Sequence, residues 1–271
     1  MVAIWSDEEG EVGAPLIALI HGTMDRSTGM LRLSRRLDDR FRVLRYDRRG
    51  YGRSVDADGV HPGPFDMGAQ VDDLVTLLAG RRAILVGHSY GGDVAMTAAA
   101  RHPGLVAGIA IYETPLSWEP WWPRTTAGAV ARSDEVPGVA AEHFMRRLVG
   151  DALWESLPER TRATRRREGA AMVGELRDLQ AHQPWSPEQI RCPLVVSRGS
   201  DGAGHHQRGM DLVHTWFPDS RLVVLDGCRH DAPMGNSELF ASSVVDAIVA
   251  DAGAPWSTAV SRRPEGPAAE N

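Results

Sequence analysis

The sequence contains no lysine, and all 30 of its basic side chains are arginine. A Schiff-base nucleophile and a Walker-type phosphate loop are therefore both excluded, because each of them needs an amine. The formal net charge of −6 is modest, and no segment resembles a basic arm of the kind that binds nucleic acid. We therefore expect no nucleic-acid partner.

Cysteine is scarce, with two residues in the whole chain. Cys192 precedes one predicted strand and Cys228 follows another. In a parallel sheet these positions lie at opposite edges, on the order of 15–20 Å apart at ~3.3 Å per residue. A disulfide requires Cα atoms within about 7 Å of each other, so we expect none.

Long apolar runs are also absent. The segment 14–20 is apolar, but it is too short to span a bilayer and fits a strand. Residues 1–13 are acidic and lack the apolar core of a signal peptide. These features predict a protein that has no membrane partner and resides in the cytoplasm.

Apolar segments of strand length alternate with helical segments along most of the chain. The stretch 65–78 is typical of a helix, because it places Met67, Val71 and Leu74 on one face. This alternation predicts an α/β fold with a mostly parallel, doubly wound sheet and right-handed crossovers. A length of 271 residues and a hydrophobic content of 42% fit one large domain with an insertion. The predicted strands are 17–20, 42–46, 83–86, 108–112, 194–197 and 222–225.

The most informative motif is the pentapeptide Gly87-His88-Ser89-Tyr90-Gly91, which follows the pattern G-x-S-x-G. It lies between the predicted strand 83–86 and the alanine-rich helical segment 92–100. A serine on such a sharp turn projects its hydroxyl above the edge of the sheet, and the helix N-terminus favours negative charge there. We therefore predict that Ser89 is a nucleophile.

A serine hydroxyl is a poor nucleophile unless it has a neighbouring base, usually a histidine that a carboxylate orients. In chains with this turn the order is serine, acid, histidine, and the histidine follows the last core strand. His230 lies on the loop that leaves the predicted strand 222–225. His230 is therefore the predicted base.

Together these motifs resemble the α/β-hydrolase family over residues 16–250. The segment Leu19-Ile20-His21-Gly22-Thr23 is similar to the strand–HG loop of that family. By this resemblance, the backbone N–H groups of Thr23 and Tyr90 would form the oxyanion hole. The segment 46–54 resembles the family's D-x-x-G-x-G-x-S turn, and we interpret it as structural.

Two residues are candidates for the acid. Glu113 follows the predicted strand 108–112, and the segment 109–115 resembles the haloalkane-dehalogenase branch of the family, which uses a glutamate there. Asp201 follows the next core strand, but it stands one residue earlier than in the family's G-x-x-D pattern. The resemblance favours Glu113 as the acid and keeps Asp201 as the alternative.

The stretch 116–191 interrupts the alternation, because it contains no convincing strand and several helical segments. The family inserts a helical cap at this place. We therefore predict an α/β-hydrolase core of residues 1–115 and 192–251, a cap of residues 116–191 and a flexible tail of residues 252–271.

Five of the eight tryptophans of the chain fall within this cap. Tryptophan buries a large area at low entropic cost and is well suited to line a pocket. We expect Trp118, Trp122 and Trp154 to line an apolar substrate pocket, while packing of the cap onto the core is the alternative role for each of them.

The adjacent histidines His205 and His206 raise the question of a metal site with Cys228 and His230. The spacing matches no known zinc motif, and adjacent histidines are expected to point apart. We therefore expect neither a metal nor any other cofactor.

Haloalkane dehalogenases and epoxide hydrolases of this fold attack with an aspartate, whereas this chain has a serine. The resemblance therefore implies acyl transfer on a small-molecule substrate: an apolar ester, lactone, thioester or activated amide. Two alternatives remain open. The same site could run cofactor-free perhydrolysis, C–C bond cleavage or a biosynthetic cyclisation, or the chain could be a non-catalytic ligand receptor.

Overall fold

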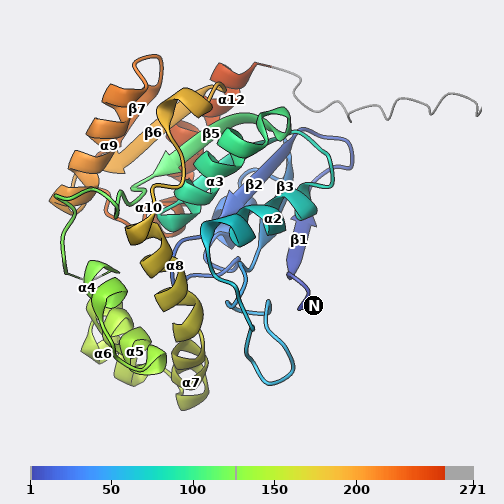
Figure 1. Cartoon of the computed structure of the whole chain (residues 1–271). Coiled ribbons are helices and arrows are strands. Elements are labelled where there is room, and N and C mark those ends of the chain that lie inside the picture. Colours follow the sequence, from blue (N-terminus) through green and yellow to red (C-terminus); the bar gives the residue numbers. More distant parts are fainter. Residues whose placement is uncertain (1, 126, 254–271) are drawn as a thin grey trace, which may run out of the picture.

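The computed structural model describes residues 2–125 and 127–253 (Figure 1). Within these residues a seven-stranded sheet has the order β1-β3-β2-β4-β5-β6-β7. β1 is antiparallel to β3, and the other neighbouring strands are parallel. The predicted α/β class with a mostly parallel sheet is confirmed. The strands are β1 (Ser6–Glu9), β2 (Leu16–Ile20), β3 (Arg42–Tyr46), β4 (Ala83–His88), β5 (Val106–Tyr112), β6 (Leu194–Gly199) and β7 (Arg221–Leu225).

The sequence pattern does not predict β1, because its residues lack the apolar alternation of a strand. Its acidic side chains are instead held by arginines of the core. Glu8 forms ion pairs with Arg42 at 3.0 Å and with Arg81 at 2.6 Å, and Arg45 pairs with Asp7. Charged side chains on an edge strand also discourage pairing with another chain.

The central strands send alternate side chains into two separate cores. In β2, Leu16, Ala18 and Ile20 enter one core, whereas Ile17 and Leu19 enter the other. Burial on both faces explains why these strands are continuous apolar runs in the sequence. Helices α2 (Met67–Leu78), α3 (Tyr90–Arg101) and α9 (Gly204–Trp216) contribute to the first core, and α1 (Leu31–Ser34), α11 (Ser237–Phe240) and α12 (Asp246–Ala252) to the second.

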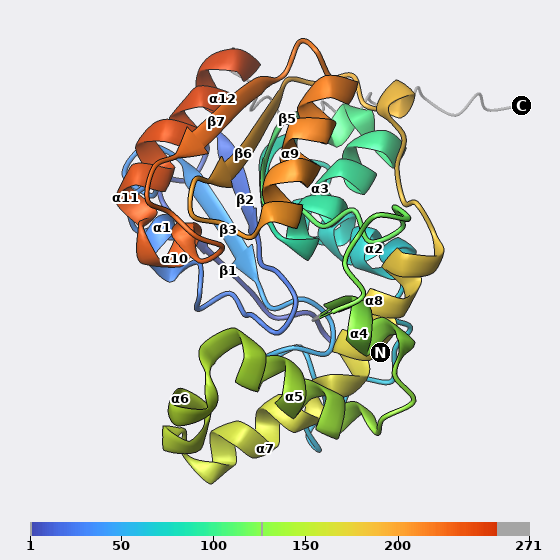
Figure 2. The same ribbon diagram turned by 90° about the vertical axis from the view of Figure 1, so that its left-hand side faces the viewer.

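Between β5 and β6 the described residues form helices and loops without a strand. Helices α4 to α8 lie together beyond one end of the sheet, and we call them the α4–α8 layer (Figures 1 and 2). The layer has an apolar cluster of its own, which includes Phe144, Trp154 and Met172 and extends to Met24 and Tyr51 of the core. The helices are α4 (Ala127–Arg132), α5 (Pro137–Val149), α6 (Asp151–Ser156), α7 (Glu159–Arg167) and α8 (Gly169–Ala181).

The helix predicted over 65–78 begins at Met67, because Asp66 caps it by accepting a hydrogen bond from the Ala69 amide at 2.9 Å. Both cysteines are free, as expected. Ala252 is still helical, and residues 254–271 of the predicted tail lie outside the described residues. No described helix is long and apolar enough to cross a membrane, and cytoplasmic residence stays a prediction.

A buried ion pair joins the α4–α8 layer to the sheet. Arg48, on the loop after β3, pairs with Glu175 of α8 at 2.7 Å, and neither side chain is exposed to solvent. Arg48 also donates to the carbonyl oxygens of His21 at 3.0 Å and Gly22 at 3.1 Å, while the Tyr51 hydroxyl donates to Glu175 at 2.7 Å. One guanidinium group therefore connects α8 with the loop that follows β2.

Glu168 makes a second connection at the start of α8. Its Oε1 atom accepts hydrogen bonds from the Arg26 side chain at 2.6 Å and from the Gly52 amide at 2.9 Å. Arg165 donates both to Glu168 at 3.1 Å and to the carbonyl oxygen of Met24 at 2.9 Å. The loop after β2 is thus held from the α4–α8 layer at two places.

Asp25, on the same loop, is a buried carboxyl group with an incomplete set of partners. Its Oδ2 atom has no hydrogen-bond partner among the described residues. Burial raises the pKa of Asp25 to about 6, although the Arg26 amide and the charges of Arg165 and Arg48 oppose this shift. The folded protein therefore binds this proton more tightly than the unfolded chain does.

The buried ion pair leads to a stability prediction. Glu175→Gln keeps the shape of the side chain but leaves the Arg48 charge buried and unpaired, which typically costs about 3–5 kcal/mol. The matched control is Asp251→Asn, which breaks the exposed pair of Arg221 and Asp251 and should cost less than about 1 kcal/mol. Urea unfolding curves measure both free energies. Equal losses in the two variants would contradict the anchoring role of Arg48.

Asp25 leads to a prediction about pH. Because its pKa is raised in the folded state, its contribution to stability is complete below about pH 4 and is lost as the pH rises through about 6. Asp25→Asn removes this dependence. Between pH 4 and pH 7, wild type should therefore lose up to about 3 kcal/mol of unfolding free energy that the variant keeps. The difference between variant and wild type should rise by the same amount. A relative free energy that stays constant over this interval would show that Asp25 ionises normally.

Candidate active site

Ser89 occupies a strained turn between β4 and α3. Its φ of 52° and ψ of −128° are rarely adopted by a residue with a side chain. The turn is tight enough to require its glycines: a Cβ atom on Gly87 would lie 2.4 Å from the Gly91 carbonyl oxygen, and one on Gly91 would lie 2.2 Å from that of Ile20. This is the geometry of a nucleophile elbow, which exposes the serine hydroxyl at the end of the strand.

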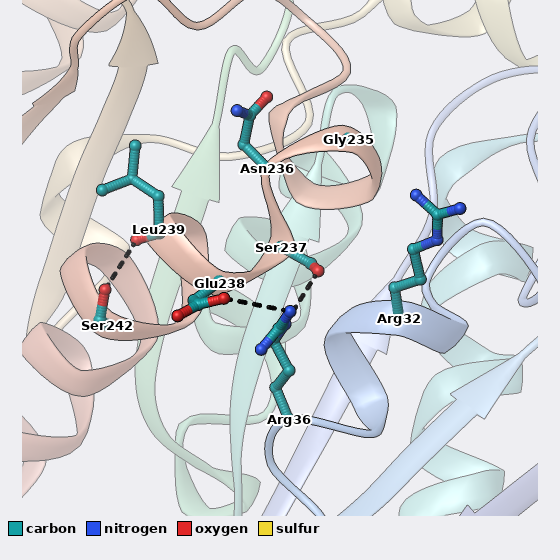
Figure 3. Close-up of a pocket in the computed structure, with 8 residues that line it drawn as sticks. All are labelled: Arg32, Arg36, Gly235, Asn236, Ser237, Glu238, Leu239 and Ser242. Atoms are coloured by element: carbon teal, nitrogen blue, oxygen red, sulfur yellow. Dashed lines mark hydrogen bonds and ion pairs between the residues drawn. The ribbon is translucent and has the colours of Figure 1, made fainter.

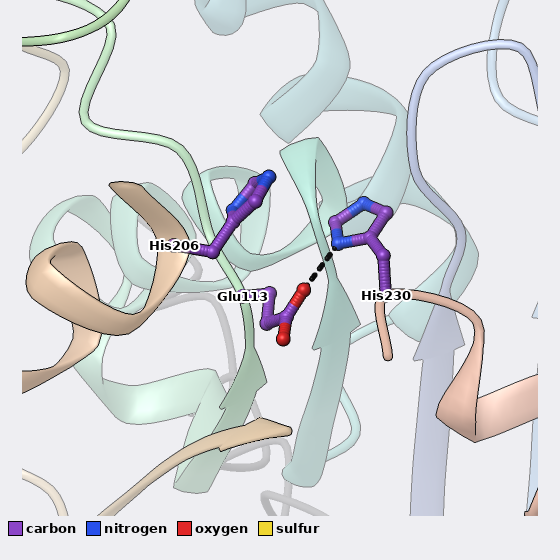
Figure 4. Close-up of side chains that lie close together, drawn as sticks. All are labelled: Glu113, His206 and His230. Atoms are coloured by element: carbon purple, nitrogen blue, oxygen red, sulfur yellow. Dashed lines mark hydrogen bonds and ion pairs between the residues drawn. The ribbon is translucent and has the colours of Figure 1, made fainter. Parts of the chain in front are cut away.

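Glu113 and His230 are brought together from positions far apart in the sequence. The Nδ1 atom of His230 lies 2.7 Å from Oε2 of Glu113 (Figure 4). Because a carboxylate only accepts hydrogen bonds, Nδ1 carries the proton and Nε2 has a free lone pair. Glu113 is completely buried, and its Oε1 atom accepts a hydrogen bond from the Gly199 amide at 3.1 Å. These contacts fix the orientation of the His230 ring.

Asp201, the alternative acid, is exposed and has other partners. Its carboxylate accepts a hydrogen bond from the Ser200 hydroxyl at 3.1 Å, and its amide donates to the Cys228 carbonyl at 3.0 Å. Asp201 therefore belongs to the turn after β6. The structure selects Glu113 rather than Asp201 as the carboxylate that contacts His230.

The loop after β2 lies directly against Ser89. A Cβ atom on Gly22 would lie 2.9 Å from the Cβ atom of Ser89. The Gly22 carbonyl faces Arg48, and in a trans peptide the following N–H points in the opposite direction, so the Thr23 N–H is directed away from Arg48. Neither this N–H nor that of Tyr90 has an acceptor among the described residues. Both donors are thus available to a ligand.

Arg48 has a role that its place in the sequence does not predict. The segment 46–54 was expected to be structural, and Asp47 and Ser54 do make local hydrogen bonds there. Arg48 does more, because it also sets the direction of the peptide before Thr23 and connects it to α8. The available signal was Glu175, an acidic residue on the otherwise apolar face of α8.

His230 lies within a cluster of four histidines. Its ring centroid is 4.6 Å from that of His88 and 4.6 Å from that of His206, and the His205 and His206 centroids are 4.3 Å apart. The expectation that His205 and His206 point apart is wrong. They stand in the first turn of α9, where successive side chains differ by about 100° around the axis, not by 180° as on a strand.

Burial keeps this cluster from becoming charged. The pKa of His206 is held well below its ordinary value by burial and by the neighbouring His230, His205 and His88, although the Glu113 backbone opposes the shift. Burial and His230 likewise lower the pKa values of His88 and His205. The rings around His230 are therefore neutral imidazoles near neutral pH.

The three tryptophans that were expected to line a pocket lie in different places. Trp122 is nearest to the site, since its ring contacts His205 at 4.9 Å and His206 at 5.5 Å between centroids. Trp118 packs edge-on against Trp185 at 5.5 Å.

For Trp154 the expectation is wrong. Its side chain is completely buried in the apolar cluster of the α4–α8 layer, beneath the guanidinium groups of Arg146 and Arg166. The short helix α6 needs this large side chain to pack against its neighbours within the layer. Trp154 therefore stabilises the layer and does not line an open pocket.

A separate surface pocket of about 660 Å³ lies between α1 and the chain around α10 (Ala232–Gly235) and α11 (Figure 3). Within it, Arg36 contacts Ser237 and Glu238, each at 3.2 Å. Its lining includes none of Ser89, Glu113 and His230. The candidate active site is therefore a different place, at the carboxyl ends of β4, β5 and β7.

Comparisons with known proteins agree with this fold. A model of the alpha/beta hydrolase family matches residues 17–243. A 2-(acetamidomethylene)succinate hydrolase of Mesorhizobium japonicum is 26% identical over 231 residues, which cover 80% of this chain and 81% of the relative. An uncharacterized protein of Mycobacterium tuberculosis is 38% identical over 261 residues, which cover 80% of this chain and 70% of the relative.

Among solved structures, a thermophilic esterase from Thermogutta terrifontis is similar, with a TM-score of 0.66 and 25% identity. The superposition covers 88% of this chain and 90% of the esterase. The matching family model spans both the Ser89 turn and the His230 loop. This chain belongs to the alpha/beta hydrolase family and is an enzyme of that fold.

Proposed function

We propose that the chain is a serine hydrolase in which Ser89 is the nucleophile, His230 the general base and Glu113 the acid that orients it. The observation that carries this proposal is the hydrogen bond of 2.7 Å from His230 to the buried Glu113, next to the strained Ser89 turn. Nucleophile, base and orienting carboxylate are the three parts that an acyl-transfer site requires.

In the first half of the proposed reaction, the Ser89 hydroxyl attacks the carbonyl carbon of the substrate while Nε2 of His230 takes the hydroxyl proton. The N–H groups of Thr23 and Tyr90 stabilise the negative charge on the tetrahedral oxygen. The intermediate then expels the leaving group, and His230 returns the proton to it. An acyl-serine remains.

In the second half, His230 removes a proton from water as the water attacks the acyl-serine. The second tetrahedral intermediate expels Ser89, which regains its proton from His230, and the carboxylic acid leaves. Glu113 stays ionised throughout and stabilises the imidazolium form of His230 in both halves. The cycle consumes one water molecule and needs no cofactor.

The proposed substrates are small, apolar esters, lactones, thioesters or activated amides. The Mesorhizobium relative is named for hydrolysis of 2-(acetamidomethylene)succinate, which contains an amide, and the Thermogutta protein is an esterase. Both support hydrolysis at an acyl carbon. We also propose that residues 116–191 act as a cap over the site, with Trp122 and Trp118 on its substrate side.

The nucleophile can be tested with a fluorophosphonate, which a deprotonating serine attacks at phosphorus with loss of fluoride. Wild type should gain the mass of one phosphonyl group in intact-mass spectrometry, whereas Ser89→Ala should gain none. Ser117→Ala is the matched control, because Ser117 is a buried serine outside the proposed triad, and it should label like wild type. Labelling of Ser89→Ala at the wild-type rate would refute the assignment.

The acid can be tested with a matched pair of substitutions. Glu113→Gln removes the negative charge beside His230 and should lower kcat/KM for a p-nitrophenyl ester by about 10³–10⁴-fold, with a small effect on KM. Asp201→Asn changes an exposed residue of a turn and should leave kcat/KM close to wild type. If the larger loss occurs in Asp201→Asn, the acid has been assigned to the wrong residue.

A further inference from the structure

Three potential metal ligands converge beside the proposed nucleophile. Glu113 at the end of β5, His206 in the first turn of α9 and His230 after β7 each offer one ligand atom, and these atoms all lie within 4.8 Å of one another (Figure 4). Two imidazole nitrogens and one carboxylate oxygen form a ligand set that zinc enzymes use, with the fourth position left to water. The separation is short enough for one ion to contact all three after small side-chain movements.

His206 is not a member of the proposed triad, yet its side chain lies beside Glu113 and His230. Its Nδ1 atom is buried and has no hydrogen-bond partner among the described residues. A buried polar atom without a partner is rare in folded proteins and calls for an explanation.

We propose that Glu113, His206 and His230 bind a single Zn²⁺ ion reversibly, and that this ion inhibits the enzyme. The binding itself does not depend on the hydrolase assignment, whereas the inhibition rests on the proposed function. Zn²⁺ suits the site because it accepts imidazole and carboxylate ligands in a small tetrahedral shell.

Inhibition follows from the chemistry of the His230 ring. Without metal, the Nδ1–H group of His230 donates a hydrogen bond to Glu113. The Nε2 atom then has a lone pair that can accept the Ser89 proton. Coordination through Nδ1 requires this proton to move, through solvent, to Nε2. The ring stays neutral and no net proton is lost, but Nε2–H has no lone pair for Ser89. The ion also occupies the carboxylate that would stabilise imidazolium.

His205 provides a matched control. It is adjacent to His206 on α9, and its ring contacts both His206 and Trp122. It is not among the three residues whose ligand atoms converge. A variant at His205 should therefore change the packing of the cluster without removing a ligand.

The experiment is isothermal titration of the purified full chain with ZnCl₂, accompanied by the visible absorption of Co²⁺ as a substitute ion. Wild type should bind one equivalent and show the intense absorption of four-coordinate Co²⁺. His206→Asn should bind at least about 100-fold more weakly, since even partners outside the ligand set contribute ~10–100-fold to metal affinity. His205→Asn should bind like wild type. Glu113→Gln, which removes a different ligand, should weaken binding in parallel.

Fluorophosphonate labelling with and without ZnCl₂ completes the test. Zn²⁺ should suppress labelling of wild type and of His205→Asn, and should not suppress labelling of His206→Asn. The proposal is overturned if wild type binds no stoichiometric ion, if His206→Asn and Glu113→Gln both bind as tightly as wild type, or if saturating Zn²⁺ leaves labelling unchanged. Absence of labelling without metal would instead refute the hydrolase assignment, while the titration would still decide whether the site exists.

Discussion

The buried guanidinium of Arg48 is the contact on which the arrangement of the candidate active site depends most. Its charge is compensated by Glu175 of α8, and its remaining N–H groups bind the carbonyl oxygens of His21 and Gly22. A buried charge of this kind tolerates little movement, because loss of any partner leaves it poorly solvated. The α4–α8 layer and the loop that carries the Thr23 N–H are therefore held in a fixed relation.

The candidate nucleophile and the candidate acid are two of the four described residues other than glycine that have a positive φ. Ser89 has a φ of 52° and Glu113 a φ of 47°, both in a region that side chains disfavour. The surrounding structure supports this strain, since β4 and β5 are completely buried and paired on both sides. A rigid sheet that holds two strained residues at its edge is a common basis for an active site, because it fixes reactive groups before the substrate binds.

The histidine cluster illustrates how burial controls chemistry. Four imidazoles in contact would repel one another if they were charged, yet burial lowers the pKa values of His88, His205 and His206 and keeps these rings neutral. Neutral imidazoles can accept a proton, donate a hydrogen bond or bind a metal. The same cluster thus also brings together the converging ligand atoms of Glu113, His206 and His230.

Much of this protein can be predicted from its sequence. Apolar runs of strand length alternate with helices, and the turn at Ser89 has a local signature, so the strands β2 to β7 and the candidates Ser89 and His230 follow from the sequence. The acidic edge strand β1, the pairing of Arg48 with Glu175 and the contact of His206 with His230 do not, and Trp154 was assigned to the wrong surface. These features depend on residues far apart in the chain, whose distances arise only when the sheet and the helices pack. Local sequence therefore determined most of the elements and the places of the candidate nucleophile and base, whereas tertiary packing decided which carboxylate meets His230, because burial and distance are properties of the assembled fold.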